Sequence, residues 1–393
     1  MLSPRQNNIA SVRRDAWVEV DLNCLEQNLK TIYSWLQDPD GLKPRLMAVV
    51  KSDAYGHGAP QIAEILVALG VDGFGVASID EGRQLRKAGI TAPVLILSPT
   101  PVWAQANALE NDLDMTVTST KQVADILETA RKLGKIALVH LKLDTGLHRL
   151  GLDLKGLPEV LDAFATPLGH KHLRLISAFS HLAVADDRAE VERQVEIFEI
   201  ARALIKSHEA CGDCYFHLAS SEAARRFAFA HYDMVRLGIN LYGLEPNTVA
   251  TDLSPAMSVR ARIIHIGEVP AGQSVGYGYT WQAQRNTVLA SIPIGYADGV
   301  DRQLSNKMLG CLHGRNIKQV GRISMDQMLF DITDVPNARE GDVITLIGQN
   351  RLNSDKCQDL YLADWAKTLG TITYELACRL RVRLPRVYTR NKK

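Results

Sequence analysis

The sequence predicts a (β/α)8 barrel of the TIM type, followed by a mostly β C-terminal domain. Between about residues 45 and 243, eight short apolar runs alternate with amphipathic stretches, which is typical of βα units around a parallel sheet. Eight such units in about 200 residues match the compact limit of this barrel. After Pro255 the segments become β-branched and alternating, and Gly, Pro and Asn turns separate them.

Each candidate barrel strand is an apolar run, and the eight runs are 46–51, 73–78, 93–98, 114–119, 136–144, 173–182, 215–220 and 234–243. Predicted helices between them include PQIAEILVALG, TKQVADILETARKLG and AEVERQVEIFEIARALIKSHEA. Several helices begin at Ser, Thr, Asp or Pro and end at Gly, as helix capping favours. The segment 16–22 also has a strand pattern, and either domain could pair with it. We place the barrel domain at 14–255 and the C-terminal domain at 256–393.

Composition excludes several function classes. The 393 residues are 46% hydrophobic, enough for a large core and two domains, and 45 basic against 44 acidic side chains give a net charge of +1. The protein's net charge therefore creates no strong electrostatic field that would attract nucleic acid or an acidic membrane. The N-terminal sequence lacks the apolar region of a secretory signal, and no apolar run is long enough to span a membrane, so we expect a cytoplasmic protein.

The cysteines favour free thiols over a disulfide framework, because they are scattered over a long chain: Cys24, Cys211, Cys214, Cys311, Cys357 and Cys378. Only Cys211 and Cys214 form a CxxC motif. No second CxxC follows it, so a structural role is favoured over zinc binding or redox chemistry. The sequence predicts no metal site.

Polar residues gather where barrel strands should end, which is where such barrels keep their active sites. They are Lys51, Lys142, Asp144, His181, Ser220, Ser221 and Arg236. A lysine in that position can form a Schiff base, because burial favours its neutral, nucleophilic amine. One strand-end lysine alone would more often be an ordinary solvated side chain. Together, however, these residues point to a catalytic site. Arg236 supports this, because it lies within an apolar strand and its charge must face an acceptor there.

A phosphate site is also predicted after the last barrel strand, where barrels commonly bind phosphate. The backbone N–H groups of Gly238 and Ile239 would contribute, and Ser221 could add a hydroxyl.

Seven motifs together carry a family resemblance: VVKSDAYGHG, LKLDTGLHRLG, SHLAVADD, VRLGINLYG, VGYGYTW, IPIGYADG and GRISMDQ. In order and approximate spacing they resemble the alanine racemases, fold type III enzymes that use pyridoxal 5′-phosphate. The resemblance runs from about residue 14 to 390. It implies an isomerase that interconverts L-alanine and D-alanine by two-base proton transfer on a pyridoxal phosphate aldimine, supplying D-alanine for peptidoglycan.

The resemblance assigns the two bases. Lys51 resembles the lysine that carries the cofactor and acts on the D-enantiomer, and Tyr277 resembles the base on the opposite face for the L-enantiomer. In the family this tyrosine reaches the partner subunit's site, which implies a homodimer with shared active sites. His181 is similar to the residue that links the tyrosine to Arg236. Such a link favours the phenolate, since a tyrosine with the ordinary pKa of about 10 is a poor base.

Other residues are implied to bind cofactor or substrate. Arg236 resembles the arginine facing the pyridine nitrogen, and because a guanidinium keeps its proton, the ring becomes a weaker electron sink. Arg149 is similar to a residue near the cofactor's phenolic oxygen and the substrate carboxylate. The family's phosphate cradle corresponds here to Tyr55, Ser221, Tyr374 and the backbone of Gly238 and Ile239. The residues that narrow the substrate entrance and bind the substrate carboxylate through backbone N–H correspond to Tyr296 and Met325, and Asp298 and Asp326 would support them.

Several alternatives stay open. Lys142 resembles a lysine that is carbamylated in many members, or it is an ordinary lysine paired with Asp144. Ser52, Asp53, Ser220 and Ser324 depart from the commoner family residues, which leaves a broader-specificity racemase open. A non-catalytic pyridoxal phosphate-homeostasis protein would lack the second domain and Tyr277. The VGYGYTW and GRISMDQ segments argue against a fold type III decarboxylase.

Overall fold

The computed structural model describes residues 14–36, 43–211, 213–244, 252–348, 357–380 and 383–390. The chain divides into two compact units. We call Lys30–Ala54 with Ala59–Leu241 the barrel unit, and Met1–Leu29, Tyr55–Gly58 and Tyr242–Lys393 the β-rich unit.

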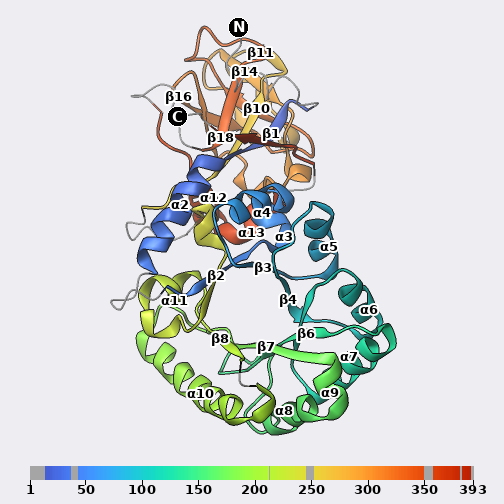
Figure 1. Cartoon of the computed structure of the whole chain (residues 1–393). Coiled ribbons are helices and arrows are strands. Elements are labelled where there is room, and N and C mark those ends of the chain that lie inside the picture. The colour runs from blue at the N-terminus through green and yellow to red at the C-terminus, as the bar shows by residue number, and fades with distance from the viewer. Residues whose placement is uncertain are drawn as a thin grey trace. The chain divides into compact units, whose positions relative to one another are not determined.

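The barrel unit contains an eight-stranded parallel sheet in the order β8-β7-β6-β5-β4-β3-β2-β9 (Figure 1). Its strands are β2 (Arg45–Val49), β3 (Gly73–Val76), β4 (Val94–Pro99), β5 (Asp114–Val117), β6 (Ala137–Lys142), β7 (Leu173–Phe179), β8 (Tyr215–His217) and β9 (Met234–Leu237). A bridge between Ser220 and Arg236 joins the segment after β8 to β9 and closes the ring. The predicted barrel is therefore confirmed, although most strands end earlier than the sequence predicts.

Helices surround the ring of strands and follow them in the chain (Figure 1). They are α3 (Lys51–Gly56), α4 (Ala59–Ala68), α5 (Ile79–Lys87), α6 (Val102–Glu110), α7 (Thr120–Leu133), α8 (Leu157–Ala165), α9 (Pro167–His172), α10 (Arg188–Ser207) and α11 (Ser221–Arg226), and α2 (Leu22–Trp35) precedes β2. Capping explains several ends. For α7, the Ser119 side chain accepts from the Gln122 N–H, and Gly134 ends the helix at φ 63°.

Apolar side chains fill one level of the barrel interior. Met47, Leu95, Phe179 and Met234 come from four different strands and pack as one buried cluster. Because side chains alternate along a strand, residues two positions away share the same face, so β7 can direct Ser177 and β9 can direct Arg236 into the interior. The polar groups of the site use this placement.

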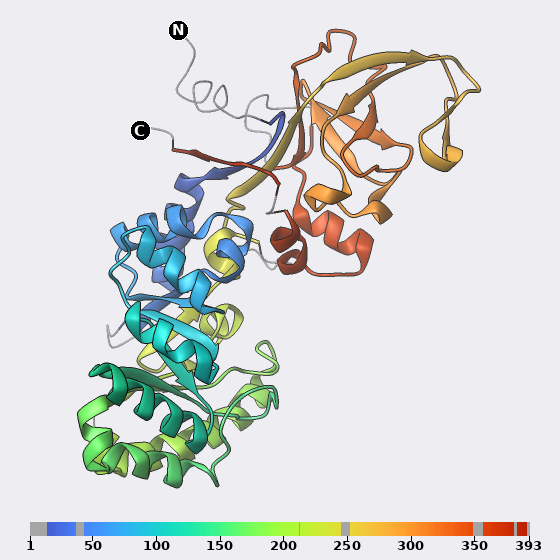
Figure 2. The ribbon, with the colours of Figure 1, turned by 90° about the vertical axis from the view of Figure 1, so that its right-hand side faces the viewer.

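The β-rich unit is built on a nine-stranded sheet in the order β11-β14-β17-β16-β15-β18-β10-β1-β19. Its strands are β1 (Ala16–Asp21), β10 (Met257–Arg262), β11 (His265–Val269), β14 (Thr287–Ile292), β15 (Leu309–Leu312), β16 (Arg315–Val320), β17 (Met328–Asp331), β18 (Val343–Ile347) and β19 (Arg386–Thr389). The first strand, β1, pairs antiparallel with β10 and parallel with β19, beside which it runs in Figure 2. A small ribbon of β12 (Ser274–Val275) and β13 (Trp281–Gln282) and the helices α12 (Leu362–Leu369) and α13 (Thr373–Arg379) complete this unit.

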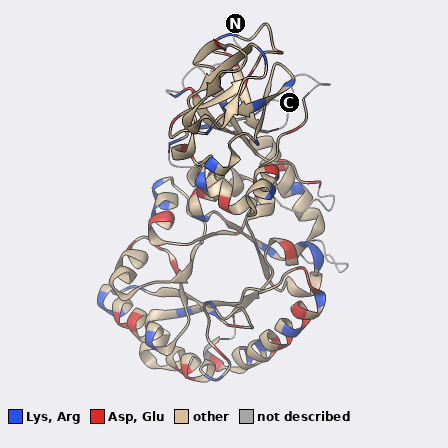
Figure 3. Ribbon diagram, turned by 180° about the vertical axis from the view of Figure 1, so that it is seen from behind, with Lys and Arg blue, Asp and Glu red and all other residues tan. Residues whose placement is uncertain are grey.

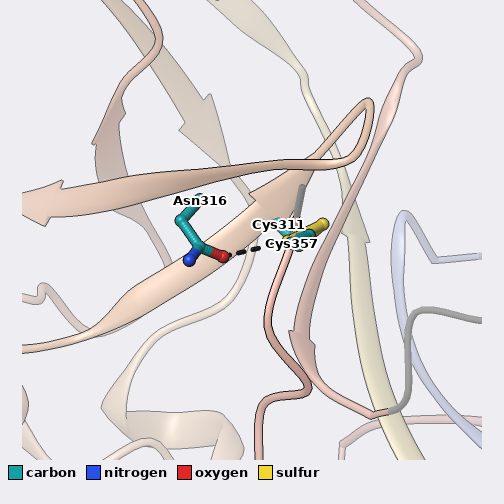
Figure 4. The surroundings of a disulfide bond; sticks show 3 residues. All are labelled: Cys311, Asn316 and Cys357. Atoms are coloured by element: carbon teal, nitrogen blue, oxygen red, sulfur yellow. Dashed lines mark hydrogen bonds between the residues drawn. A yellow bond between two sulfur atoms is a disulfide. The ribbon is translucent and has the colours of Figure 1, made fainter. Parts of the chain in front are cut away.

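One expectation about the cysteines is wrong. Cys311 on β15 forms a disulfide with Cys357, 46 residues away, and the Asn316 side-chain oxygen lies 3.0 Å from the Cys357 sulfur (Figure 4). This pairing depends on how the sheet brings β15 to a distant segment, so spacing alone gave no sign of it. Cys211 and Cys214 are buried thiols, and burial raises their pKa values to about 11 and about 12.

Charges of both signs are spread along the helices around the barrel (Figure 3), which agrees with the balanced composition. Within the described ranges, no helix combines the length and the apolar character needed to cross a membrane.

Candidate active site

Lys51 lies two residues after β2, at the start of an unusual left-handed turn. The next four residues, Ser52 to Tyr55, have φ values of 53°, 56°, 54° and 52°, and Gly56 follows at 80°. Side chains with a Cβ disfavour this conformation by roughly 1–2 kcal/mol per residue. Such a run persists only where its surroundings hold it, and strain of this kind concentrates at functional sites.

Two carboxylates hold this turn. Glu81 at the start of α5 accepts the backbone N–H of Ser52 at 2.7 Å and that of Ala77 at 2.7 Å. Asp53 accepts the N–H of Ala59 at 2.8 Å, which ties the turn to the start of α4. Ionised acceptors give stronger hydrogen bonds than neutral ones, so these contacts offset part of the backbone strain. They fix the base of the Lys51 side chain.

The barrel unit brings four cationic side chains into one electrostatic cluster, which we call the cationic cluster: Lys51, Lys142, Arg149 and Arg236. Burial, followed by the nearby Arg236 and Arg149 cations, lowers the pKa of Lys142 from 10.5 to about 7. Burial and then the Arg236 cation lower the pKa of His181 from 6.5 to about 3. His181 is therefore neutral at pH 7, and about half of the Lys142 amines are neutral.

The lowered pKa of Lys142 predicts a dependence of stability on pH. Between pH 7 and 10.5 the unfolded chain binds more protons at this residue than the native protein, so native stability rises with pH in that window. The largest possible gain in the free energy of unfolding is about 4–5 kcal/mol, because a pKa difference of one contributes about 1.4 kcal/mol.

Urea unfolding of cofactor-free protein in CO2-free buffer measures this effect. The free energy of unfolding of the wild type, relative to Lys142→Met, should rise by at least about 1 kcal/mol from pH 7 to pH 9.5. A difference that stays constant over this range would contradict the lowered pKa.

Arg236, on β9, is held by a dense set of acceptors and is only 5% exposed. Its Nη1 donates to the carbonyl of His217 and to His217 Nδ1, both at 3.0 Å. Its Nη2 donates to the carbonyls of Ser180 at 2.6 Å and Leu218 at 3.0 Å. Burial lowers the pKa of Arg236 to about 9, so the guanidinium stays charged at pH 7.

Arg236 also sets the tautomer of His181. Its Nη2 lies 3.4 Å from His181 Nδ1, so a proton on Nδ1 would point at the guanidinium, which is itself only a donor. The lone pair of His181 Nδ1 therefore faces the cation, and the single proton of the neutral ring sits on Nε2. The ring can then donate a hydrogen bond from Nε2 to another group.

Phe179 lies close to two of the cations. The Lys142 amine lies 4.6 Å from the centre of the Phe179 ring, and the Arg236 guanidinium carbon lies 5.3 Å from it. The ring face therefore carries favourable cation–π contacts where a direct Lys–Arg contact would be repulsive.

Three of the residues predicted to bind phosphate, Ser221, Gly238 and Ile239, lie on two neighbouring loops of the barrel unit. Ser221, at the start of α11, accepts the Gly238 N–H at its hydroxyl oxygen at 3.1 Å. Asn240 donates to the Ser221 carbonyl at 3.3 Å and ties the loops together. Ile239 follows Gly238 at the start of the 3-10 helix η3 (Ile239–Tyr242).

The remaining predicted residues lie in the β-rich unit and form two groups. The Tyr55 ring lies 5.3 Å from that of Tyr242 and 6.2 Å from that of Tyr374, centre to centre. Tyr277, Tyr296 and Met325 line an open pocket of about 1070 Å³. They are unusually exposed for large apolar side chains, at 71%, 43% and 53%.

Asp298 and Asp326 support this pocket. The fully buried Asp298 side chain accepts the Gly295 N–H at 3.0 Å and pairs with Arg14 at 2.6 Å. Arg383 lies 3.4 Å from Asp298 and 2.7 Å from Asp326, next to Met325. The turn η5 (Tyr296–Asp298) and the Met325 segment are thereby linked through one arginine.

Two models of known protein families match the chain. The alanine racemase N-terminal domain matches residues 20–246, and the alanine racemase C-terminal domain matches residues 256–388. The chain belongs to the alanine racemase family.

Relatives and solved structures agree with this assignment. The alanine racemase of Synechocystis sp. is 40% identical over 386 residues, which cover 96% of this chain and 99% of the relative. The alanine racemase of Clostridium difficile 630 has 32% identity and a TM-score of 0.88, covering 97% of each chain. The Bacillus anthracis alanine racemase with bound L-Ala-P has 31% identity and a TM-score of 0.86, also covering 97% of each chain. The resemblance expected from the sequence is confirmed, and this racemase is an isomerase.

Some residues of this racemase's site were missed from the sequence. Glu81, Phe179 and His217 were absent from the predicted site, although each contacts a predicted residue or its turn. For His217 the available signal was its position inside the apolar run YFHLAS, because a polar residue in a buried strand needs a partner.

Proposed function

We propose that this racemase interconverts L-alanine and D-alanine with pyridoxal 5′-phosphate bound at the mouth of its barrel, and with Lys51 and Tyr277 as the two bases. The cationic cluster is the observation that carries the proposal. It gathers four basic side chains where the described barrel residues offer few anions, and these side chains add to burial, the larger cause, in lowering the pKa values of Lys142 and His181. Such a site favours an anionic ligand.

The donor set fits pyridoxal 5′-phosphate. Lys51 supplies an amine at the end of the first barrel strand, and Arg236 supplies a charged donor that keeps its proton. Ser221, Gly238 and Ile239 supply hydroxyl and backbone donors for a phosphate, with Tyr55 and Tyr374 as further hydroxyls. When bound, the cofactor withdraws electrons from the amino acid and weakens its Cα–H bond.

The protein's residues then handle the proton and the substrate. The Lys51 amine removes or returns the proton at Cα on one face, and the Tyr277 phenolic oxygen does so on the other. Arg149 and the Met325 backbone N–H bind the substrate carboxylate, and Tyr296 narrows the entrance. His181 donates from Nε2 and so stabilises a tyrosine phenolate, a role that its tautomer suits.

A second copy of the chain completes each site in this proposal. Tyr277, Tyr279, Tyr296 and Met325 expose large apolar surfaces on one unit, and such surfaces on soluble proteins usually mark an interface. We infer a homodimer in which Tyr277 serves the cofactor bound by the other chain.

Reduction with borohydride tests where the cofactor is held. After incubation with pyridoxal 5′-phosphate, reduction and proteolysis, we expect the fixed cofactor on the peptide that contains Lys51. Modification of another lysine, such as Lys142, would contradict the site. Chiral analysis of the product from L-alanine in the same preparation checks that the protein is active.

A further inference from the structure

Arg236 is a buried cation without a direct counter-ion. Within the described part of the chain, its side-chain hydrogen bonds go to backbone carbonyls and to the neutral rings of His181 and His217. A buried charge that lacks an opposite charge is costly. In the proposed function the anionic cofactor offsets this charge, and a fixed carboxylate of the protein can orient the guanidinium that bears it.

A continuous hydrogen-bonded chain leads from Arg236 to such a group. His217 Nδ1 lies 3.0 Å from Arg236, and His217 Nε2 lies 2.8 Å from the Ser177 hydroxyl. That hydroxyl lies 2.6 Å from His140 Nδ1, and His140 Nε2 lies 3.2 Å from the Asp114 carboxylate. The chain crosses the adjacent strands β8, β7, β6 and β5, with His140 and Ser177 in register.

Every member of this chain is buried. The exposed fractions are 5% for Asp114, 1% for His140 and zero for Ser177 and His217. Water does not compete for these contacts, so each donor must find its acceptor within the chain.

The two ends force the direction of every hydrogen bond. Arg236 can only donate, so His217 Nδ1 accepts and the His217 proton sits on Nε2, facing Ser177. The buried Ser177 hydroxyl must then donate its own proton to His140 Nδ1. This leaves the His140 proton on Nε2, where it meets the carboxylate, which can only accept.

We propose that Asp114 acts on Arg236 through His217, Ser177 and His140, which form a one-directional chain of hydrogen bonds that orients the guanidinium. Hydrogen bonds aligned in one direction polarise and strengthen one another. These four residues are thus positioning residues for Arg236. The inference rests on the proposed function, in which Arg236 faces the cofactor.

The nitrogen spectra of the histidines test the direction of the chain. The holoenzyme, labelled with 15N-histidine, is examined by magic-angle-spinning NMR, and His140→Gln and His217→Gln assign the signals. We expect both rings to be neutral, with Nδ1 unprotonated and Nε2 protonated. A doubly protonated His140, or a proton on Nδ1 of either ring, would overturn the proposal. This readout does not require activity, so it stands even if the proposed function fails.

Kinetics test the coupling of the two ends. We expect Asp114→Asn to lower kcat for alanine racemisation by about 10-fold or more and to change KM by less than about 2-fold, because substrate contacts remain. The matched control is Thr116→Val, which removes a buried hydroxyl two residues along the same strand and lies outside the chain. It should keep kcat within about 2-fold.

A double-mutant cycle separates transmission through the chain from general damage. Ser177→Ala interrupts the chain, so the double variant Asp114→Asn/Ser177→Ala should be no slower than the slower single variant. Losses that multiply in the double variant, or a folded Asp114→Asn enzyme with wild-type kcat, would overturn the proposal. If these variants do not fold, the wild-type nitrogen spectra still decide the direction of the chain.

Discussion

Replacing Lys51 with alanine is expected to lower kcat for alanine racemisation by at least about 10⁴-fold, because in the proposed function this one side chain both holds the cofactor and serves as a base. The loss should be equal in both directions, since each direction needs proton transfer on both faces. Chiral chromatography of the product, started from each enantiomer with added pyridoxal 5′-phosphate, measures it.

The matched control for this variant is Lys121→Ala. Lys121 is exposed on α7 and pairs only with Asp125 within its own helix, so its loss should leave kcat within about 2-fold. A Lys51→Ala enzyme that keeps more than a hundredth of the wild-type kcat would contradict the assigned role.

Replacing Tyr277 with phenylalanine should lower racemisation by about 10³-fold, because in the proposed function the phenolic oxygen is the base on one face only. Lys51 remains, so the variant should still exchange the Cα hydrogen of D-alanine with solvent deuterium, without inversion. NMR of D-alanine in D2O measures this exchange. The expected result is therefore an enzyme that opens one C–H bond without racemising.

Tyr279→Phe provides the control for Tyr277→Phe. Tyr279 lies two residues away in the same 3-10 helix, η4 (Tyr277–Tyr279), and is similarly exposed at 76%. Its loss should leave both exchange and racemisation within about 2-fold. If Tyr277→Phe exchanges L-alanine faster than D-alanine, the two bases are assigned to the wrong faces.

The barrel could be predicted because its signal is local. Each run such as IALVHLKLD carries its own strand pattern, and eight of them in series leave few other folds. The strand ends were less certain, because β7 stops at Phe179 while Ser180 and Leu182 beyond it are still buried. Side chains after a strand can remain buried when a loop folds back over the barrel, so burial does not mark the end of the hydrogen-bonded ladder.

The parts of the site that escaped prediction depend on contacts between distant residues. Glu81 lies 29 positions from Ser52, whose backbone it binds, and nothing in α5 marks it as different from other first-turn acids. The left-handed turn after Lys51 has no glycine until Gly56, so the usual sequence signal for positive φ was missing. His140 and Ser177 resemble ordinary buried polar residues until the register of β6 and β7 places them side by side.

Mixing two inactive variants tests the central claim, that Lys51 and Tyr277 of different subunits share one site. After subunit exchange between Lys51→Ala and Tyr277→Phe, each mixed dimer has one site with both bases and one site with neither. Because half of the dimers are mixed after random exchange, activity should recover to about one quarter of the wild-type value. Mass spectrometry of the native dimers proves the exchange. Proven exchange without any recovery of racemisation would contradict a site shared between two subunits.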